Sequence, residues 1–244
     1  MLEFFNAIFY VPIYNLLIFL VDIIPGGDAG VAVILATIFI KIVLLPLSIQ
    51  ATKTQKGMKE IEPELKELRE KYKEDKEKQA LEMLALYKAH NIKPFSTMFI
   101  ALIQIPILIY LFLVFQNESF TAINTDILYS FVPTPEVVST LFLGSILVTS
   151  SSLVLAVLAA LAQFVHSYIA IKIPKPEHKE GETPSFGAEF GRSMAINARY
   201  FLPLLIGYFA YVLGGALALY FITSSVFQTL QEVLVTRRAK EKAV

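Results

Sequence analysis

The chain has 244 residues, of which 55% are hydrophobic and 17% are charged, and its formal net charge is zero. This composition is more apolar than that of a soluble globular domain and is typical of an integral membrane protein. The sequence contains no cysteine, which excludes disulfides, thiolate metal sites, a cysteine nucleophile and a lipid-anchoring cysteine.

Residues 1–28 precede the first long apolar tract. They contain three acidic residues but no Lys or Arg, so they do not resemble a cleaved signal peptide. Segment 4–24 is long enough to cross a bilayer, but Pro12 and its polar residues fit equally a helix that lies in the membrane interface. We expect the interfacial helix, followed by a glycine-rich turn into the first span.

The first apolar tract, residues 29–51, has the length of a transmembrane helix and contains one cation, Lys41, close to its middle. The other twenty of the 21 Lys and Arg residues lie outside every apolar tract. Because a cation at this depth is costly, it needs a partner, water or a function. We interpret Lys41 as the functional centre of the molecule.

Residues 52–93 are highly charged and predict a cytoplasmic helical hairpin with a polar turn at 73–76. Pro63, between two glutamates, favours the start of its first helix. Apolar residues at three- and four-residue steps predict one shared seam, formed by Met58, Ile61, Leu65, Leu68, Tyr72, Leu81, Leu84 and Tyr87. A solvated helical loop is the plainer alternative, but a mobile lid that meets incoming polypeptide explains the seam better.

Residues 94–236 contain the remaining apolar tracts, and their number of crossings follows from the charges between them. Basic residues are concentrated in three segments: eleven in 52–94, five in 172–199 and four from 237 onward. The positive-inside rule places all three on the cytoplasmic side only if the tract 137–171 crosses once and the tract 200–231 crosses twice. This predicts an all-α protein with the N-terminus outside, a basic cytoplasmic tail at 237–244, and five spans, at about 29–51, 95–116, 150–172, 197–213 and 215–236.

The sequence carries no recognisable catalytic or nucleotide-binding motif, and its three histidines are scattered. We therefore expect neither an enzyme nor a cofactor or metal. Polar residues inside the predicted spans include Gln104, Gln163, Ser224 and Ser225. Serines usually bond back to their own helix, whereas buried glutamines indicate packing contacts or a wet cavity. His166 fits a helix-to-helix hydrogen bond better than a ligand.

Short motifs distributed over most of the chain resemble the YidC insertase family, which includes the mitochondrial oxidase-assembly and chloroplast Albino insertases. The family has a cation in its first core span, a charged hairpin, Gln-x-Pro in its second span and a Gln-containing third span. The matching segments here are 41–47, Met58 with Pro63, 86–88, 91–94, 104–107, 142–144, 161–164, 202–203 and 215–221. The chain is similar to a short, core-only bacterial member, although Lys41 replaces the usual Arg, Phe221 a Trp or Tyr, and Ser225 an Asn.

The resemblance implies an inward-open polar groove in the bacterial plasma membrane, from which client helices leave sideways into lipid. Lys41 would be its charge centre, Gln163 would line it, and Tyr220 and Phe221 would form an apolar guide surface. Gln104, Ser224 and Ser225 would line the groove or pack helices. Met58, Pro63, Tyr72 and Tyr87 would shape the capture hairpin.

The implied partners are nascent membrane proteins and membrane lipid, with the Sec translocon and the ribosome as further candidates. A small anion transporter or channel that uses Lys41 as its binding charge is the alternative function. Transporters are usually built from repeated halves, whereas five spans cannot be halved. A scaffold without transport activity would leave Lys41 unexplained.

Overall fold

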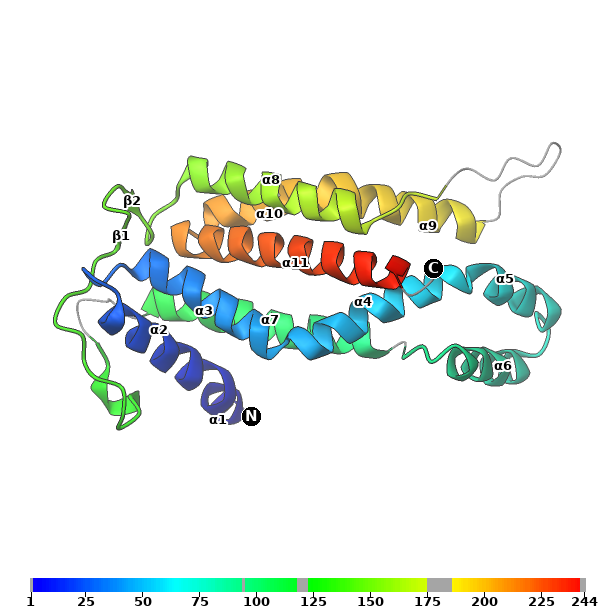
Figure 1. Ribbon diagram of the computed structural model, residues 1–244, viewed down its shortest axis with the longest axis horizontal. Helices are drawn as coiled ribbons and strands as arrows, with labels where there is room; N and C mark the ends of the chain where they lie inside the picture. The colour runs from blue at the N-terminus through cyan, green and yellow to red at the C-terminus, as the bar shows by residue number, and fades with distance from the viewer. Residues whose placement is uncertain (1, 94, 118–122, 175–185, 242–244) are drawn as a thin grey trace. The chain divides into compact units, whose positions relative to one another are not determined.

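The computed structural model describes residues 2–93, 95–117, 123–174 and 186–241, and these are almost entirely helical (Figure 1). The all-α membrane fold expected from the sequence is confirmed. The chain divides into two compact units. Unit 1 contains Met1–Lys41 and Ile107–Val233, and unit 2 contains Ile42–Pro106 and Leu234–Val244.

The N-terminal helix of unit 1 is interrupted by a wider π-helical turn. Its parts are α1 (Leu2–Phe5), η1 (Asn6–Tyr10) and α2 (Val11–Ile23). The turn lies directly before Pro12, which cannot donate a backbone hydrogen bond, and the N–H of Val11 reaches back five residues to Asn6 O. By length and composition Glu3–Ile23 could also cross a membrane, so its interfacial position stays a prediction.

One face of α2 is packed inside unit 1. Tyr14, Leu17, Ile18 and Val21 are each only 1% exposed. Asn15 is equally buried, and its side chain donates to Ile127 O (2.9 Å) and accepts from the Tyr129 N–H (2.6 Å). This polar residue therefore fixes α2 to the loop that contains the short 3-10 helix η2 (Thr125–Ile127).

The first apolar tract does not form one continuous helix, contrary to the expectation for residues 29–51. Helix α3 (Ala29–Val43) ends just before Leu44, and α4 (Leu45–Glu60) begins after it. Pro46 lies in the first turn of α4, where its missing N–H and bulky ring prevent the preceding helix from continuing. Helix α7 (Phe95–Asn117) also contains a proline, Pro106, and the division between the two units falls there.

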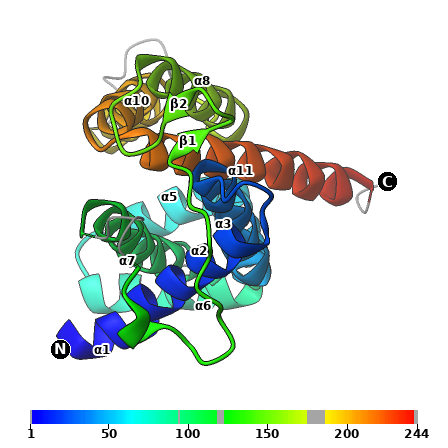
Figure 2. The same cartoon turned by 90° about the vertical axis from the view of Figure 1, so that its left-hand side faces the viewer.

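Helices α8 (Leu153–Ala170) and α10 (Leu202–Val212) lie side by side in unit 1 (Figures 1 and 2). Helix α11 (Gly215–Glu241) is joined to α8 by a hydrogen bond from Ser225 to Gln163. Helix α9 (Phe186–Ile196) and the π-helical turn η3 (Asn197–Phe201) lead into α10. The close contact between α8 and α10 depends on small residues. A side chain on Gly207 of α10 would clash with α8, because its Cβ would lie only 2.8 Å from Ala160 Cβ. Small residues let membrane helices approach each other in this way.

Four helices of the described chain are long and apolar enough to cross a membrane: Glu3–Ile23, Met98–Gln116, Leu153–Ala170 and Glu189–Val212. The interrupted pair Ala29–Val43 and Leu45–Glu60 gives a fifth if it counts as one span. Helix α11 does not meet this criterion, because several Ser, Thr and Gln residues lower its apolarity. Residues 215–221 of α11 are nevertheless buried, as expected for a helix that faces protein rather than lipid. A crossing at 215–236 remains a prediction from the charge distribution.

The charged hairpin of unit 2 consists of α5 (Glu62–Lys71) and α6 (Lys76–Ala89), and α4 extends further into this region than expected (Figure 1). Pro63 lies in the first turn of α5, as predicted. The polar turn also falls where it was predicted. Asp75 begins α6 by accepting a hydrogen bond of 2.9 Å from the Lys78 N–H.

The apolar seam of the hairpin differs from the predicted one in its second helix. Ile61, Leu65 and Ile92 form its buried centre, and the surrounding partly buried residues are Met58, Met83, Leu86 and Tyr87. The assignment of Leu81 and Leu84 to this seam was wrong, because they are 61% and 47% exposed. Helix α6 has two apolar stripes, and the chain turns back after it so that Ile92 packs against the other stripe. Tyr72 lies outside this cluster, with its ring beneath the ammonium groups of Lys71 (5.3 Å) and Lys78 (5.2 Å).

Candidate functional site: a polar cluster between three helices

Lys41 lies in the last turn of α3, three residues before the helix is interrupted at Leu44. Its side chain is half-buried and is engaged by a neighbouring group. It therefore has the surroundings expected of a costly cation in an apolar segment, namely partial access and a partner.

Gln163 connects α8 to α11 through its side-chain amide. Its Oε1 accepts a hydrogen bond of 2.8 Å from the Ser225 hydroxyl, and its Nε2 donates to Ser167 Oγ at 3.3 Å. Ser225 and Ser167 are buried, at 2% and 1% exposure. The contact satisfies polar groups that would otherwise be costly inside an apolar bundle, so Gln163 joins two helices in addition to any role toward a substrate.

His166 lies near Lys41 and near a charge that the sequence analysis did not single out. It interacts electrostatically with both Glu232 on α11 and Lys41 on α3, and all three residues belong to unit 1. Glu232 is itself half-buried and engaged by a neighbour. We name Lys41, His166 and Glu232 the polar cluster.

The spacing along α8 and α11 places the polar cluster next to the Gln163 contact. His166 follows Gln163 by three residues, and Glu232 follows Ser225 by seven, so each pair shares one face of its helix. A stripe of polar side chains therefore continues along both helices. The sequence did contain a signal for Glu232, because this acidic residue lies within the predicted span 215–236. However, it lies close to the end of that span, where charged residues are common in membrane helices.

Two further polar groups near this stripe, the hydroxyls of Tyr220 and Ser224, are buried and lie close enough to interact with each other. Nδ1 of His166 is buried without a hydrogen-bond partner among the described residues. Buried polar atoms are usually satisfied by protein or by ordered water. The two hydroxyls and the His166 ring therefore add to the polar groups that α8 and α11 bury beside the Gln163 contact.

The remaining predicted site residues are placed as follows. Tyr220 and Phe221 are 3% and 9% exposed, with ring centroids 5.6 Å apart, so neither presents an open surface in this structure. Their role as a guide surface therefore stays a prediction. Gln104 belongs to unit 2, where it is half-buried and has an interaction partner. In the described part of the chain no group of three His, Asp or Glu side chains could hold a metal ion.

Asp28 fixes the start of α3 to the β-hairpin formed by β1 (Leu141–Phe142) and β2 (Ile146–Leu147). One carboxylate oxygen accepts from the Gly30 N–H (2.8 Å) and the Val31 N–H (3.0 Å), which caps the helix. The other accepts from the Leu143 N–H at 2.8 Å, in the turn between the two strands. Ser139 completes the connection by exchanging backbone hydrogen bonds with Gly27 and Ala29.

The residues that follow β2 hold the start of α11 in a similar way, through backbone hydrogen bonds. The N–H groups of Gly215 and Ala216 donate to Ser150 O and Val148 O, both at 2.8 Å. Helices α3 and α11 are thus fastened to one loop at their N-terminal ends. Lys41 lies twelve residues beyond Ala29, or about 18 Å along an ideal helix, so the polar cluster lies far from this fastened end.

Comparison with known proteins gives the family. The profile of the family described as "60Kd inner membrane protein" matches residues 20–242. The chain is 29% identical over 219 residues to the membrane protein insertase YidC of Clostridium tetani, covering 89% of this chain and 86% of that protein. It is 32% identical over 223 residues to membrane protein insertase YidC 1 of Listeria monocytogenes, covering 89% and 67% respectively. On this basis, together with its helical membrane fold, the chain belongs to the YidC family of membrane protein insertases.

Proposed function

We propose that this protein inserts nascent membrane proteins into the bilayer, with Lys41 as the charge that attracts their translocating segments. The observation that carries the proposal is the polar cluster of Lys41, His166 and Glu232 within an apolar helical unit. Family membership supports the general activity, because relatives across nearly the whole chain are named membrane protein insertases.

The physical task of an insertase is to carry a polar segment across a layer that offers it no hydrogen bonds. A wet groove that reaches partway from the cytoplasm would shorten the apolar path. The fastened starts of α3 and α11 support an arrangement that stays closed at that end and opens at the other. The client's apolar helix then leaves sideways into lipid, where burial of its side chains makes insertion favourable.

We propose that Glu232, which interacts electrostatically with His166, also serves as a counter-charge near Lys41 while no client is bound. Two opposite charges in partly dry surroundings attract each other more strongly than in water, and this lowers the cost of placing each one there. A carboxylate on an incoming segment would compete with Glu232 for the ammonium group. Such exchange keeps client binding weak enough for release.

The hairpin of α5 and α6 is the element we assign to capture. It is the most charged part of the chain, and Leu81 and Leu84 form an exposed apolar stripe on α6. The distribution of Lys and Arg supports an N-terminus outside and a cytoplasmic C-terminus. The Sec translocon and the ribosome are proposed partners on that side, and Lys242 of the basic tail lies outside the described residues.

The test is an insertion assay in proteoliposomes with two clients that differ only in their N-terminal tails. Lys41→Glu should abolish insertion of the client with an acidic tail and leave that of a neutral tail largely unchanged, whereas Lys41→Arg should support both. Equal loss with both clients would show that Lys41 does not act through tail charge. Lost anion uptake by Lys41→Glu, with insertion of both clients intact, would instead favour the transporter alternative.

A further inference from the structure

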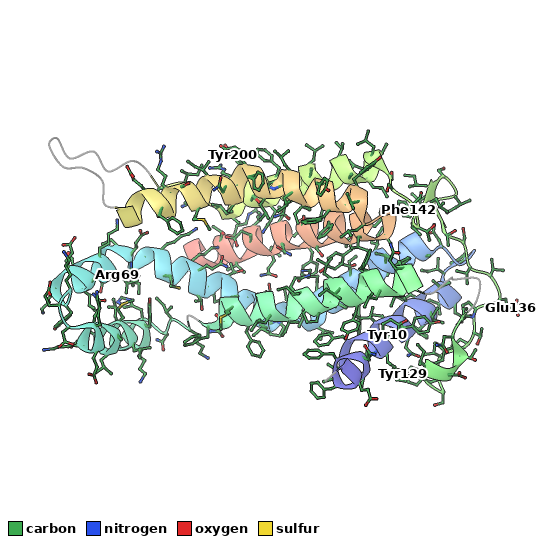
Figure 3. All side chains as sticks on the ribbon, turned by 180° about the vertical axis from the view of Figure 1, so that it is seen from behind. Tyr10, Arg69, Tyr129, Glu136, Phe142 and Tyr200 are labelled. Atoms are coloured by element: carbon green, nitrogen blue, oxygen red, sulfur yellow. The ribbon has the colours of Figure 1, made fainter. Side chains whose placement is uncertain are left out.

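A second cation of unit 1, Arg199 in η3, lies against the aromatic side chains at the end of α8. Its guanidinium carbon is 3.9 Å from the centre of the Tyr168 ring and 5.8 Å from that of Tyr200. One terminal nitrogen donates a hydrogen bond of 3.3 Å to Tyr168 O. Tyr200, which is labelled in Figure 3, belongs to η3 like Arg199 itself. The guanidinium is therefore held in a defined orientation.

The aromatic residues form an exposed frame around Arg199. The Phe164 ring lies 6.0 Å from Tyr168 and 6.1 Å from Tyr200. Tyr168 and Tyr200 are 57% and 47% exposed, which leaves their rings open to the surroundings. Tyrosines gather at the boundary between hydrocarbon and headgroups, where their rings are buried and their hydroxyls stay hydrated.

The depth of Arg199 follows from the length of α8. This helix has 18 residues and is about 27 Å long, close to the roughly 30 Å of a bilayer's hydrocarbon core. Tyr168 lies in its last turn, and Lys172 follows shortly after. Arg199 is thus at the level where headgroups begin, on the side that carries the basic segments of the chain.

The hydrogen-bonding capacity of Arg199 is largely unused. A guanidinium has five N–H donors, and its Nε is buried without a partner among the described residues. In that part of the chain no carboxylate pairs with Arg199. An oriented guanidinium that has no carboxylate partner among the described residues matches, at this depth, a phosphate group, which can accept two parallel hydrogen bonds from it.

We propose that Arg199, framed by Tyr168 and Tyr200, binds the phosphate of an anionic glycerophospholipid in the cytoplasmic leaflet. A lipid is favoured over a free phosphate because apolar side chains continue along α8 from the site toward the hydrocarbon. Leu161 and Val165 are 55% and 50% exposed and offer a surface for an acyl chain. The negative headgroup also complements the positive charge of this membrane side.

Native mass spectrometry of the full-length protein, titrated with phosphatidylglycerol in detergent, tests the site. The wild-type protein should bind one phosphatidylglycerol more tightly than the rest. Arg199→Gln should weaken this binding roughly tenfold, the effect of losing a charge-assisted pair. The matched control is Arg192→Gln, because Arg192 is exposed and lies on the preceding helix α9. It should leave the tight binding unchanged.

Three results would overturn the proposal: unchanged lipid affinity in Arg199→Gln, an equal loss in Arg192→Gln, or full displacement of the lipid by excess inorganic phosphate. If Arg199→Gln does not fold, Arg199→Lys keeps the charge but lacks the planar fork. It should weaken binding about threefold, and wild-type affinity in this variant would contradict the assigned geometry. Because the readout is lipid binding, the result does not depend on insertase activity.

Discussion

The hydroxyl of Ser225 on α11 donates a hydrogen bond of 2.8 Å to Gln163 Oε1 on α8, and so joins two helices through buried polar groups. The same amide continues to Ser167 on its own helix. The contact lies next to the polar cluster, so the helices that carry His166 and Glu232 are held together by it.

A double-mutant cycle with Ser225→Ala and Gln163→Met measures this contact. The two substitutions should be coupled by about 0.6 kcal/mol, the average for hydrogen bonds between membrane helices, and by no more than about 1.7 kcal/mol. Reversible unfolding in mixed micelles gives the free energies. Thr223→Ala serves as the matched control, because Thr223 is on the same helix but makes no hydrogen bond to Gln163. An equal coupling free energy for the Ser225–Gln163 and Thr223–Gln163 pairs would show that this hydrogen bond does not stabilise the protein specifically.

Asp28→Ala should loosen the fastened end of α3. The substitution leaves the N–H groups of Gly30, Val31 and Leu143 without their acceptor, at a cost of about 1–3 kcal/mol. Hydrogen exchange should increase in the β-hairpin and in the first turn of α3. Asp126→Ala is the control, because that exposed carboxylate makes no hydrogen bond in the described part of the chain. Unaltered exchange in Asp28→Ala would argue against its role as a fastening.

Ile92→Ala should destabilise the cytoplasmic hairpin by about 2–5 kcal/mol, the usual cost of truncating a buried isoleucine. Leu81→Ala removes a comparable volume from an exposed position and should change stability by less than about 0.5 kcal/mol. Limited proteolysis between residues 58 and 92 reports both changes. Similar protease sensitivity in the two variants would mean that the seam is not centred on Ile92.

Individual residues show how much of the structure could be predicted from the sequence. Lys41 could be identified because a single cation in an apolar tract stands out without knowledge of any contact. Pro63 and the polar turn before α6 could also be placed, since proline and capping preferences act locally. Leu81 and Leu84 were misassigned because α6 has two apolar stripes, and the choice between them depends on Ile92 from the returning chain.

The interruption at Leu44 and the position of Glu232 required the structure for different reasons. Pro46 was visible in the sequence, but proline within a membrane span is tolerated often enough that a break did not follow from it. Glu232 lies near the end of α11, where charges are ordinary. Only its electrostatic contact with His166, on another helix, connects it to Lys41.

Glu232→Gln tests the proposed internal counter-charge. Removing the competing carboxylate should strengthen attraction between Lys41 and acidic tails, and raise their insertion roughly fivefold, which corresponds to about 1 kcal/mol. Initial insertion rates at limiting insertase concentration are the appropriate measurement. Glu232→Asp retains the charge and should behave like the wild-type protein. A lower rate in Glu232→Gln would indicate that Glu232 acts directly in insertion rather than as a competitor.

The central claim is that Lys41 acts on clients through opposite charge, and a reciprocal charge exchange tests it most directly. Insertion is measured for wild-type protein and Lys41→Glu, each with clients whose otherwise identical tails are acidic or basic. The account predicts that Lys41→Glu fails with the acidic tail and recovers insertion with the basic tail. Failure of Lys41→Glu with both tails, while the protein remains folded, would contradict it.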